Sequence, residues 1–388
     1  MIRRQRAASN ERAANRQKVI AVPSENAWAS ARRNILRACH AGLDSVALRA
    51  EVMRRLRPVL PVDAFWFATA DPATLLFTGS LIDGIPEKAT PLFVANEFAQ
   101  MDVNKWTQLA RALRPVNSLY LATQGQPDRS TRYRDICLPL GLGDELRVVL
   151  RTDGATWGFM CLHRERNGAN FTPAEAAFLA DISPHLAAGL RAALLLERAE
   201  AASELDSPGL IILAHDFSLL AATPAGERWL SELADYPLRQ ELPQVIYAAV
   251  ARLTAVECGA APEPDLAPRA RVRTRGGQWL VLHASRLTGR GAAEIAVIME
   301  PAPPAELAPL LLPAYGLTRR EDDVVQMVLR GTATVGIAAK LRISEYTVQQ
   351  HLKSVFDKIG VGSRRELVAR VFGEQYKPRM RNAILRRD

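Results

Sequence analysis

The sequence predicts a multidomain α+β protein, in which two modules with antiparallel sheets precede an all-helical C-terminal domain. The chain of 388 residues is longer than one ordinary domain, which holds roughly 100–200 residues. Two hairpin signatures lie in its middle, each a pair of strand-like runs around a glycine turn, at Asp153-Gly154 and Gly276-Gly277. Residues 317–372 show only helical periodicity, with helix-capping residues at short intervals.

The first module is expected over residues 28–204, after a flexible basic arm at 1–27 that lacks apolar periodicity. It begins with two amphipathic helices, from Trp28 to Cys39 and from Val46 to Leu56. Strands and a helix are expected after these two helices. The strand-like runs are 64–69, 74–78, 146–150 and 156–162, and the helical stretch is 91–113. Thr172-Pro-Ala-Glu175 is a capping box with proline at the first helical position. It predicts a long helix that bends near Pro184 and continues to the end of the module.

The second module is expected over residues 205–300. Its predicted elements are a strand at 210–214, helices at 225–233 and 242–253, a hairpin of 270–274 and 279–284, and a last strand at 294–300. A proline-rich linker, residues 301–315, follows, and within it Leu307 to Leu312 predict a short connecting helix.

The C-terminal domain, expected over residues 316–374 before a basic tail at 375–388, consists of short helices. Its start signals are the capping box Leu317-Thr-Arg-Arg-Glu321, the N-cap Ser344 and a second capping box Ser363-Arg-Arg-Glu366, and its stop signals are Gly331 and Gly360. The spacing predicts a very short second helix, Thr334 to Leu341, that a three-residue turn joins to the third. Two such helices, braced by flanking helices, form a helix-turn-helix.

The third helix of this domain should turn a polar face outward. Val348, Leu352 and Phe356 recur at helical spacing and should be buried. The opposite face then carries Glu345, Tyr346, Gln349, Gln350 and Lys353. Because a helix fits the major groove of DNA with its N-terminal half against the base edges, these side chains are candidates for base recognition. The candidates for phosphate contacts are Thr347, His351 and Arg342. Any surface helix has a polar face, but the spacing, caps and local charge together favour DNA binding.

Ordered motifs run through the same domain: Leu317-Thr-x-Arg-Glu321, Gly331, Ile337-Ala338-x-x-Leu341-x-Ile343-Ser344, Thr347-Val348-x-x-His351-Leu352, Phe356-x-Lys358-Ile359-Gly360-Val361-x-Ser363-Arg364 and Glu366-Leu367-Val368. They resemble the LuxR-type helix-turn-helix domain of bacterial transcription regulators, over about 56 of the 388 residues. The resemblance implies that Gln349, Gln350 and Lys353 lie toward the bases. It also implies that the last helix dimerises, with Arg364, Leu367, Val368 and Val371 as candidate contacts.

Two departures from that family pattern bear on DNA affinity. The family usually has Lys or Arg where this chain has Gln349, and Asn-Lys-Glu-Ile-Ala where it has Thr334-Val335-Gly336-Ile337-Ala338. Gly336 should weaken a short helix by about 1 kcal/mol. Val335 and Gln349 remove two cationic contacts, and each lost phosphate contact should flatten the salt dependence of binding by about one unit.

The two middle modules carry weaker resemblances. Residues 28–200 resemble GAF-like sensor domains through Arg134-Asp-Ile-Cys137, Gly141-Leu-Gly-Asp-Glu145, Trp157-Gly158 and Phe171-Thr-Pro-x-Glu175. Residues 205–300 resemble a PAS domain through Leu210 to Leu213, Thr223-Pro-Ala-Gly226 and Gly277-x-Trp279. Such folds are scaffolds and do not by themselves specify a ligand. Candidates to line an apolar pocket are Phe65, Trp66, Phe67, Trp157 and Phe159, although at strand spacing such residues more often form plain core.

No catalytic or cofactor motif is found. The sequence has no GxSxG, HExxH or Walker-type GxxxxGK[ST] segment, and Gly141-Leu-Gly143 lacks the third glycine of a dinucleotide loop. Four separate cysteines, Cys39, Cys137, Cys161 and Cys258, are expected to be buried core residues. His163, His185, His215 and His283 are scattered. We therefore expect no enzyme, no cofactor and no metal site. No run approaches 18 apolar residues, so we expect a cytoplasmic protein without a membrane span.

The charge is concentrated at the two ends of the chain. Residues 1–37 hold nine Lys/Arg and two Asp/Glu, residues 316–388 hold fifteen and eight, and the segment between them is mildly acidic. Localised positive charge is typical of a protein that binds a polyanion. The sequence therefore predicts a homodimeric transcriptional regulator that binds double-stranded DNA and responds to a small-molecule effector or partner. Two alternatives stay open: an adapter whose helix-turn-helix no longer binds DNA, and a sensory enzyme.

Overall fold

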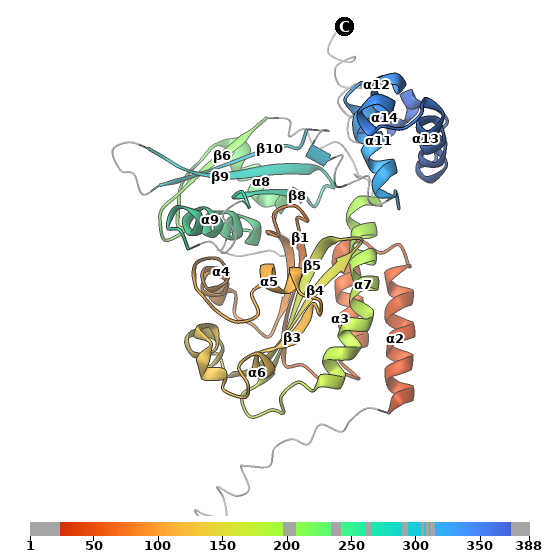
Figure 1. Cartoon of the computed structure of the whole chain (residues 1–388). Helices are drawn as coiled ribbons and strands as arrows, with labels where there is room; N and C mark the ends of the chain where they lie inside the picture. Colours follow the sequence, from red (N-terminus) through yellow and green to blue (C-terminus); the bar gives the residue numbers. More distant parts are fainter. Residues whose placement is uncertain are drawn as a thin grey trace, which may run out of the picture.

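A computed structural model of the chain describes residues 24–196, 207–233, 242–260, 266–288, 294–303, 306–307, 310 and 315–373. These residues form two five-stranded antiparallel sheets with attached helices and a C-terminal group of helices (Figure 1). The predicted fold class, a multidomain α+β protein, is confirmed. The predicted basic arm and tail lie outside the described residues, except that the first helix begins at Glu25, three residues earlier than expected.

The first sheet domain, residues 25–196, has its strands in the order β2-β1-β5-β4-β3. The strands are β1 (Ala64–Ala70), β2 (Phe77–Asp83), β3 (Val116–Ser118), β4 (Leu142–Thr152) and β5 (Ala155–Glu165). The predicted β4–β5 hairpin is confirmed, and its turn residues Asp153 and Gly154 have φ angles of 51° and 78°. Such positive φ angles are typical of a two-residue turn that matches the twist of the strands.

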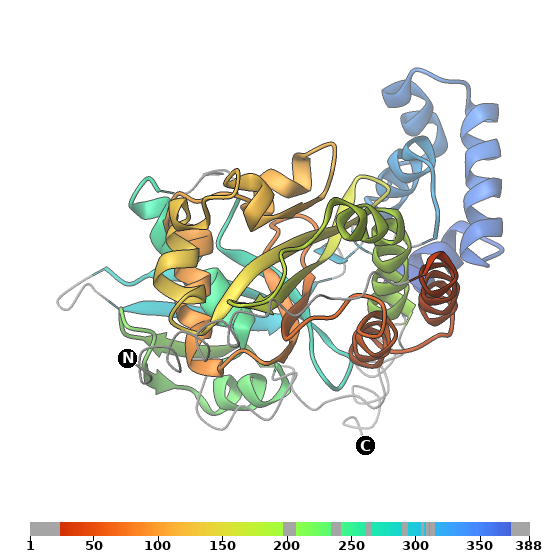
Figure 2. The same ribbon diagram turned by 90° about the horizontal axis from the view of Figure 1, so that it is seen from below.

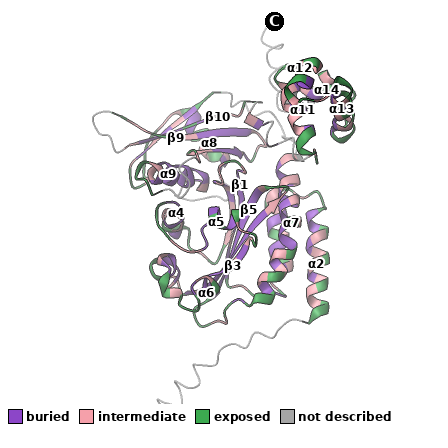
Figure 3. Ribbon diagram, in the orientation of Figure 1, coloured by how far each residue is buried: buried purple, intermediate pink, exposed green. Residues whose placement is uncertain are grey.

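Helices cover both faces of this sheet. The helices on one face are α2 (Glu25–Cys39), α3 (Ser45–Leu56) and α7 (Pro173–Leu196), which lie side by side in Figure 2. Those on the other face are α4 (Thr90–Ala99) and α5 (Trp106–Arg111). Shorter elements at the sheet edge are α6 (Leu119–Ala122), the 3-10 turns η1 (Glu87–Ala89) and η2 (Pro127–Arg129), and the π-helical turn η3 (Tyr133–Cys137). The sheet is therefore buried on both faces (Figure 3).

The long helix α7 forms where its capping box predicts it. Thr172 Oγ1 accepts a hydrogen bond from the Glu175 backbone, and the Glu175 carboxylate accepts one from the Thr172 backbone. The helix is continuous through Pro184. Proline at 184 has no N–H for the carbonyl of Ala180, and the Ser183 hydroxyl donates to that carbonyl at 3.1 Å instead. The rest of the predicted helix, beyond residue 196, lies outside the described residues.

Two predicted elements of this domain were wrong in extent. The helix expected over 91–113 is divided into α4 and α5, because the segment between them makes tertiary hydrogen bonds. Asp102 there accepts from the Arg132 backbone at 2.7 Å, and Asn104 has a positive φ of 57°. The strand expected over 74–78 begins only at Phe77, because Asp71 to Leu76 form a turn in which Leu75 has a φ of 58°.

The second sheet domain, residues 209–301, has the strand order β7-β6-β10-β9-β8. The strands are β6 (Gly209–Leu213), β7 (Leu219–Ala222), β8 (Arg269–Arg273), β9 (Trp279–Arg286) and β10 (Ile295–Pro301), and the helices are α8 (Pro224–Leu233) and α9 (Gln244–Glu257). The predicted β8–β9 hairpin is confirmed, while the edge strand β7 was not expected. The resemblance to PAS domains stays a prediction.

The two sheet domains share one apolar core. A single cluster contains Phe98 and Trp106 of the first domain together with Trp229 and Leu282 of the second. Helix α9 packs against α4 and β2 as well as against its own sheet (Figure 1). An ion pair crosses the same boundary: Asp71 accepts from Arg271 Nη2 at 2.5 Å and Nε at 3.0 Å, and its side chain is 1% exposed. The domains are therefore joined by packing and by a buried charge pair.

The C-terminal domain consists of α11 (Arg319–Leu329), α12 (Thr334–Leu341), α13 (Glu345–Ile359) and α14 (Arg364–Gly373) around its own core. The predicted capping box of Thr318 and Glu321 is present in full. In the second box, Ser363 caps Glu366, but the Glu366 carboxylate accepts from Gly362 rather than from Ser363. Among the described residues, no helix is both long and apolar enough to cross a bilayer. The short linker helix expected at 307–312 lies largely outside the described residues.

The buried ion pair predicts a large effect of Asp71→Ala. Removal of one partner leaves the Arg271 guanidinium buried without its counter-charge, so the free energy of unfolding should fall by about 3–5 kcal/mol. The matched control is Asp181→Ala, which breaks an exposed pair with Arg32 and should cost less than about 1 kcal/mol. Urea titrations of both variants measure this, and equal losses would contradict the role given to Asp71.

Candidate nucleic-acid interface and aromatic pocket

The turn between α12 and α13 is fixed by local hydrogen bonds. Arg342 ends α12 in the left-handed conformation, with φ 54°. Ser344 then caps α13, since its hydroxyl accepts from the Thr347 backbone at 3.0 Å. These two residues thus end α12 and begin α13 on either side of Ile343.

A polar clamp fixes α13 against α11. The Glu321 carboxylate accepts from Lys358 Nζ and from Ser354 Oγ, each at 2.7 Å. Burial alone would raise the pKa of Glu321, but these hydrogen bonds hold it at about 2. The carboxylate is therefore ionised and links the capping box of α11 to the last turns of α13.

The orientation of α13 agrees with the sequence pattern. Val348 and Leu352 are buried, and Phe356 is half-buried. The exposed residues between 345 and 353 are Glu345, Tyr346, Gln349, Gln350 and Lys353, with Tyr346 73% exposed. Thr347 and His351 are half-buried beside this face, and Arg342 is exposed before it. All eight residues predicted to contact DNA thus lie along one helix and its preceding turn, and their roles stay predictions.

The departures in α12 have visible consequences. Val335 is 63% exposed, so an apolar side chain lies on the surface beside the turn. Ala333 precedes the helix without a side-chain cap. A Cβ atom added at Gly336 would lie 3.0 Å from Thr332 Cγ2, so the glycine accommodates a tight contact.

The candidate dimer contacts in α14 differ in what they do. Arg364 donates to Thr334 Oγ1 and to the Thr332 carbonyl, which ties α14 to the start of α12. Leu367 is fully buried in the domain core, so it has no surface to offer a partner chain. Val368 is half-buried, and the side chain of Val371 lies outside the described residues. Of the four, Val368 and Val371 remain candidates for a dimer contact.

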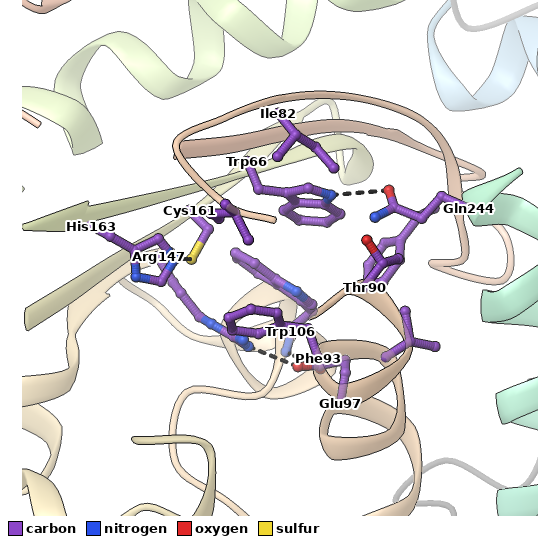
Figure 4. Close-up of a pocket in the computed structure, with 13 residues that line it drawn as sticks. Trp66, Ile82, Thr90, Phe93, Glu97, Trp106, Arg147, Cys161, His163 and Gln244 are labelled. Atoms are coloured by element: carbon purple, nitrogen blue, oxygen red, sulfur yellow. Dashed lines mark hydrogen bonds and ion pairs between the residues drawn. The ribbon is translucent and has the colours of Figure 1, made fainter. Parts of the chain in front are cut away.

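A pocket opens between the first sheet and helices α4 and α5 (Figure 4). This aromatic pocket has a cavity volume of about 50 Å³, and the space between its lining residues is about 490 Å³ when the open solvent at its mouth is included. It is lined by Trp66, Phe77, Ile82, Ile85, Thr90, Phe93, Val94, Glu97, Trp106, Arg147, Cys161, His163 and Gln244. The residue from furthest along the chain is Gln244, the first residue of α9, and its side-chain oxygen accepts from Trp66 Nε1 at 3.0 Å.

Of the five aromatic residues proposed from sequence, only Trp66 lines the pocket. Side chains alternate between the two faces of a strand. Phe65 and Phe67 therefore point to the helices α2, α3 and α7, and Trp157 lies in the same cluster. Phe159 is on the pocket side but packs beneath Trp106, with ring centroids 4.8 Å apart. The interpretation of these residues as plain core holds for four of the five.

The floor of the pocket is a buried ionic network. Arg147 Nη1 bonds Glu97 at 2.7 Å, its Nε bonds Glu145 at 3.1 Å, and its guanidinium carbon lies 4.4 Å from the centre of the Trp106 ring. Arg132 bonds the other oxygen of Glu145 at 2.7 Å. Burial would raise the pKa of Glu145, but the two guanidinium groups hold it well below its usual range. Reasoning from sequence missed this network, although Glu145 and Arg147, charged residues at alternate positions of an apolar strand, were a signal for it.

Glu145, Cys161 and His163 meet at the edge of the pocket. One potential ligand atom from each lies within 4.8 Å of the others, a spacing that could hold a metal ion. Both oxygens of Glu145 are already bonded to arginines, and the two nearby guanidinium groups would repel a cation. The Cys161 thiol donates to Glu145 at 3.1 Å, and burial raises its pKa well above the usual value, so no thiolate is offered. The arrangement therefore favours a hydrogen-bonded cluster over a metal centre.

Three of the four cysteines are buried, as the sequence predicts. Cys39, Cys137 and Cys161 are buried, whereas Cys258 is exposed at the end of α9, so the prediction of a core residue was wrong there. The helix α9 ends at Glu257, and the chain leaves the core at that point.

Two protein families match this chain, one in the C-terminal domain and one in the first sheet domain. The family described as "Bacterial regulatory proteins, luxR family" matches residues 316–371, and the GAF domain family matches residues 44–190. The spore germination protein GerE of Bacillus subtilis is 38% identical over 52 residues, which are 13% of this chain and 70% of that protein. The monoamine regulon transcriptional regulator of Klebsiella aerogenes is 44% identical over 61 residues, 16% of this chain and 26% of that protein.

Another regulatory protein is matched over only a small part of its length. The relative described as "Probable transcriptional regulatory protein SgaR", from Hyphomicrobium methylovorum, is 40% identical over 57 residues, 15% of this chain and 27% of that protein. Thus the chain spans about a quarter of the length of that relative. Among solved structures, a GAF domain/HD domain protein from Geobacter sulfurreducens has 19% identity and a TM-score of 0.30 over 40% of this chain and 97% of its own. The VqsR LBD domain from Pseudomonas aeruginosa has 16% identity and a TM-score of 0.30 over 44% of this chain and 98% of its own.

The buried His163 predicts an acid-dependent loss of stability. Burial lowers the pKa of His163 from the usual 6.5 to about 4. The charge of Glu145 raises this pKa, and the charges of Arg147 and Arg132 lower it. Between pH 6.5 and 4 the unfolded chain binds a proton at this residue that the folded chain does not. The contribution of His163 to the free energy of unfolding is therefore fully present above pH 6.5. It falls by about 3 kcal/mol as the pH is lowered to 4.

The variant His163→Asn should lack this contribution. The difference in unfolding free energy between native protein and variant should shrink by about 3 kcal/mol from pH 7 to pH 4. Burial raises the pKa of Asp144 to about 6, so its contribution to stability changes with pH in the opposite direction. That contribution is the same in native protein and variant, and the comparison cancels it. Urea titrations at a series of pH values measure it, with His40→Asn at an exposed site as the control. A pH-independent difference for His163→Asn would contradict the assignment.

Proposed function

Because this chain belongs to the LuxR family of bacterial regulatory proteins, we propose that it is a transcriptional regulator that binds double-stranded DNA through α13 and senses a small molecule in the first sheet domain. One observation carries the proposal: the residues matched to that family place a capped, rigidly clamped helix with its polar face in solvent. A helix of this kind fits the major groove, where base edges carry a readable pattern of donors and acceptors.

The exposed side chains suggest a division of roles. Gln349 and Gln350 can each pair with adenine through two hydrogen bonds, and Lys353 can donate to guanine or to phosphate. Glu345 and Tyr346 lie in the first turn of the helix, where base edges are closest. Thr347, His351 and Arg342 flank the face and suit phosphate contacts. Phosphate contacts position the helix, and base contacts supply the specificity.

The proposal includes a homodimer and a cytoplasmic location without enzymatic activity. Two copies would place two α13 helices about one DNA turn apart on a pseudo-palindromic site. The surface of α14 around Val368 is the candidate contact, since Leu367 and Arg364 are used within the domain, and Val371 stays a candidate from the sequence alone. The aromatic pocket is the candidate effector site, and α7 and the segment after β10 are the connections through which an occupant would act on the C-terminal domain.

An adapter that no longer binds DNA is the second candidate. The exposed Val335 favours it, because an apolar surface beside the turn replaces a cation of the family pattern. In that case the C-terminal domain would hold another protein instead of DNA.

Replacement of the reading side chains tests the proposal. Lys353→Ala and Gln350→Ala should each weaken binding to a selected target site by about tenfold, because each removes contacts worth roughly 1–3 kcal/mol. Selection from random duplexes provides the site, and fluorescence anisotropy measures the affinity. The matched control Lys88→Ala removes the same charge from an exposed turn of the first sheet domain and should leave affinity unchanged. Failure to select any duplex at low salt would leave the adapter as the better function.

The two missing cations give a separate test. Val335→Lys and Gln349→Lys should each strengthen binding and steepen the plot of log affinity against log salt by about one unit, if each new ammonium group reaches a phosphate. Anisotropy titrations between low and moderate salt yield the slope. An unchanged slope in both variants would show that these positions do not face the DNA backbone.

A further inference from the structure

The chain turns back onto the sheet domains after β10. Ala302 donates its backbone N–H to the Trp279 carbonyl at 2.8 Å. Leu307 and Leu310 are 1% and 3% exposed, and they belong to the apolar cluster between the first sheet and its helices α2, α3 and α7. A free linker to the C-terminal domain would expose both leucines. We call the described residues of this stretch the docked segment: Ala302, Pro303, Glu306, Leu307 and Leu310.

The docked segment lies beside one part of the second sheet. Side chains alternate along a strand, and Leu280 of β9 belongs to the cluster that contains α9. Trp279 and Val281 therefore lie on the opposite face, yet they are 6% and 0% exposed. Ile298 of β10 lies on the same face as Val281 and is 42% exposed, so this face is covered only in part. The covered part is the one next to Trp279, to which the docked segment is bonded.

Two arginines of β8 hold the docked segment. Arg271 Nη1 donates to the Glu306 carbonyl at 2.9 Å, while the same guanidinium also binds Asp71 of the first sheet domain. Arg269 Nη2 lies 2.6 Å from the Glu306 carboxylate, and both of these side chains are 31% exposed. Strand β8 is the edge strand that packs against β2 (Figure 1). The docked segment is therefore fixed at the boundary between the two sheet domains.

This attachment shortens the connection to the DNA-binding domain. Helix α11 begins at Arg319, and the chain from Leu310 to Arg319 can span at most about 30 Å. If the docked segment were released, the connection would start at Pro301, the end of β10, and could span about 60 Å. Docking thus halves the distance over which the C-terminal domain can move from the sheet domains.

The reach of the C-terminal domain bears on the DNA sites that two copies can occupy together. Each base pair inserted between two half-sites moves one of them by about 3.4 Å and turns it by about 35° around the helix axis. A domain on a short connection cannot follow that shift and rotation without strain. A domain on a connection twice as long can follow both.

We propose that the docked segment sets the half-site spacing that the dimer accepts, and that its release allows binding to sites of other spacings. Leu307, Leu310 and Arg269 are then positioning residues, because they act through the place of the C-terminal domain and not through contact with DNA. The inference rests on the proposed function, a dimeric DNA-binding regulator, and assigns one of its specificity determinants.

Release of the docked segment tests the proposal. The probes are duplexes with two copies of a selected half-site, at the selected spacing and with two or four base pairs inserted. Two inserted base pairs should weaken binding of the native chain about tenfold or more, because the second half-site is no longer reached. In the double variant Leu307→Ser, Leu310→Ser the same insertion should cost less than about threefold, and affinity for a single half-site should not change. Anisotropy titrations measure both.

The control makes the same substitutions at exposed leucines of the first sheet domain. Leu92 and Leu113 are 54% and 96% exposed, so Leu92→Ser, Leu113→Ser should keep the native dependence on spacing. A native dependence that persists in Leu307→Ser, Leu310→Ser would overturn the proposal, and so would a native chain that binds all spacings equally.

A longer connection gives a second test that leaves the docked segment intact. Insertion of six Gly/Ser residues after Pro313 adds about 20 Å of reach and should broaden the accepted spacings as release does. An unchanged profile would show that another contact, such as α14, sets the spacing, and the proposal would be wrong.

Hydrogen exchange checks the docking itself. Backbone amides of residues 302–310 should exchange slowly in the native chain and rapidly in Leu307→Ser, Leu310→Ser, while those of β9 stay protected in both. Rapid exchange of residues 302–310 in the native chain would contradict docking.

The two proposals fail separately. If no duplex is bound, the DNA-binding function is wrong and the spacing role falls with it. If single half-sites are bound but spacing has the same effect in native chain, double variant and insertion variant, the regulator stands and the role of the docked segment is wrong.

Discussion

The buried guanidinium of Arg147 holds the pocket side of the first sheet domain together. It bonds Glu97 of α4 and Glu145 of β4, and it lies over the ring of Trp106 at the start of α5. A lone buried charge is costly, so each member of this set is stable only because the others are in place. Helices α4 and α5 thus have one position on the sheet, and the walls of the aromatic pocket follow from that position.

The network continues through side chains that would otherwise be isolated. Arg132 bonds Glu145 and the Val103 carbonyl, and Lys105 bonds the carbonyls of Asn96 and Glu97. Lys105 is only 2% exposed, and this burial lowers its pKa to about 8. Cys161 and His163 lie opposite Arg147 and Glu145 on the neighbouring strand, so the network also orients the polar edge of the pocket.

The same wall connects the sheet domains. Trp66, which pairs with Cys161 across the sheet, donates to Gln244 of α9, and Asp71 at the end of its strand receives Arg271 of β8. The second domain therefore packs against the part of the first that forms the pocket. An occupant that shifts Trp66 would act directly on α9, whereas the described C-terminal helices pack around an apolar core of their own.

Local signals in the sequence were sufficient for the C-terminal domain. The Thr318–Glu321 capping box, the Ser344 cap and the left-handed Gly360 are set by residues within a few positions of one another. The polar face of α13 could be predicted for the same reason, since helical periodicity alone decides which side Val348 and Leu352 bury. The dimer contacts of α14 stay a prediction, and the burial of Leu367 was not foreseen because it depends on packing between helices.

In the first sheet domain, the position of the pocket could not be predicted from local sequence signals. Strand alternation separated Phe65 and Phe67 from Trp66, but only the assembled sheet decided which face carried a pocket. The break between α4 and α5 depends on Asp102 bonding Arg132, which is 30 residues away in the chain. Gln244 joins the pocket from a further domain.

The sequence by itself therefore determined the elements, the helix-turn-helix and its outward face, because caps and periodicity act over one or two helical turns. Tertiary structure alone decided the pocket, its buried charges and its second-domain wall. Those depend on pairing opposite charges from distant segments in a region without water, where no local pattern can specify the partner.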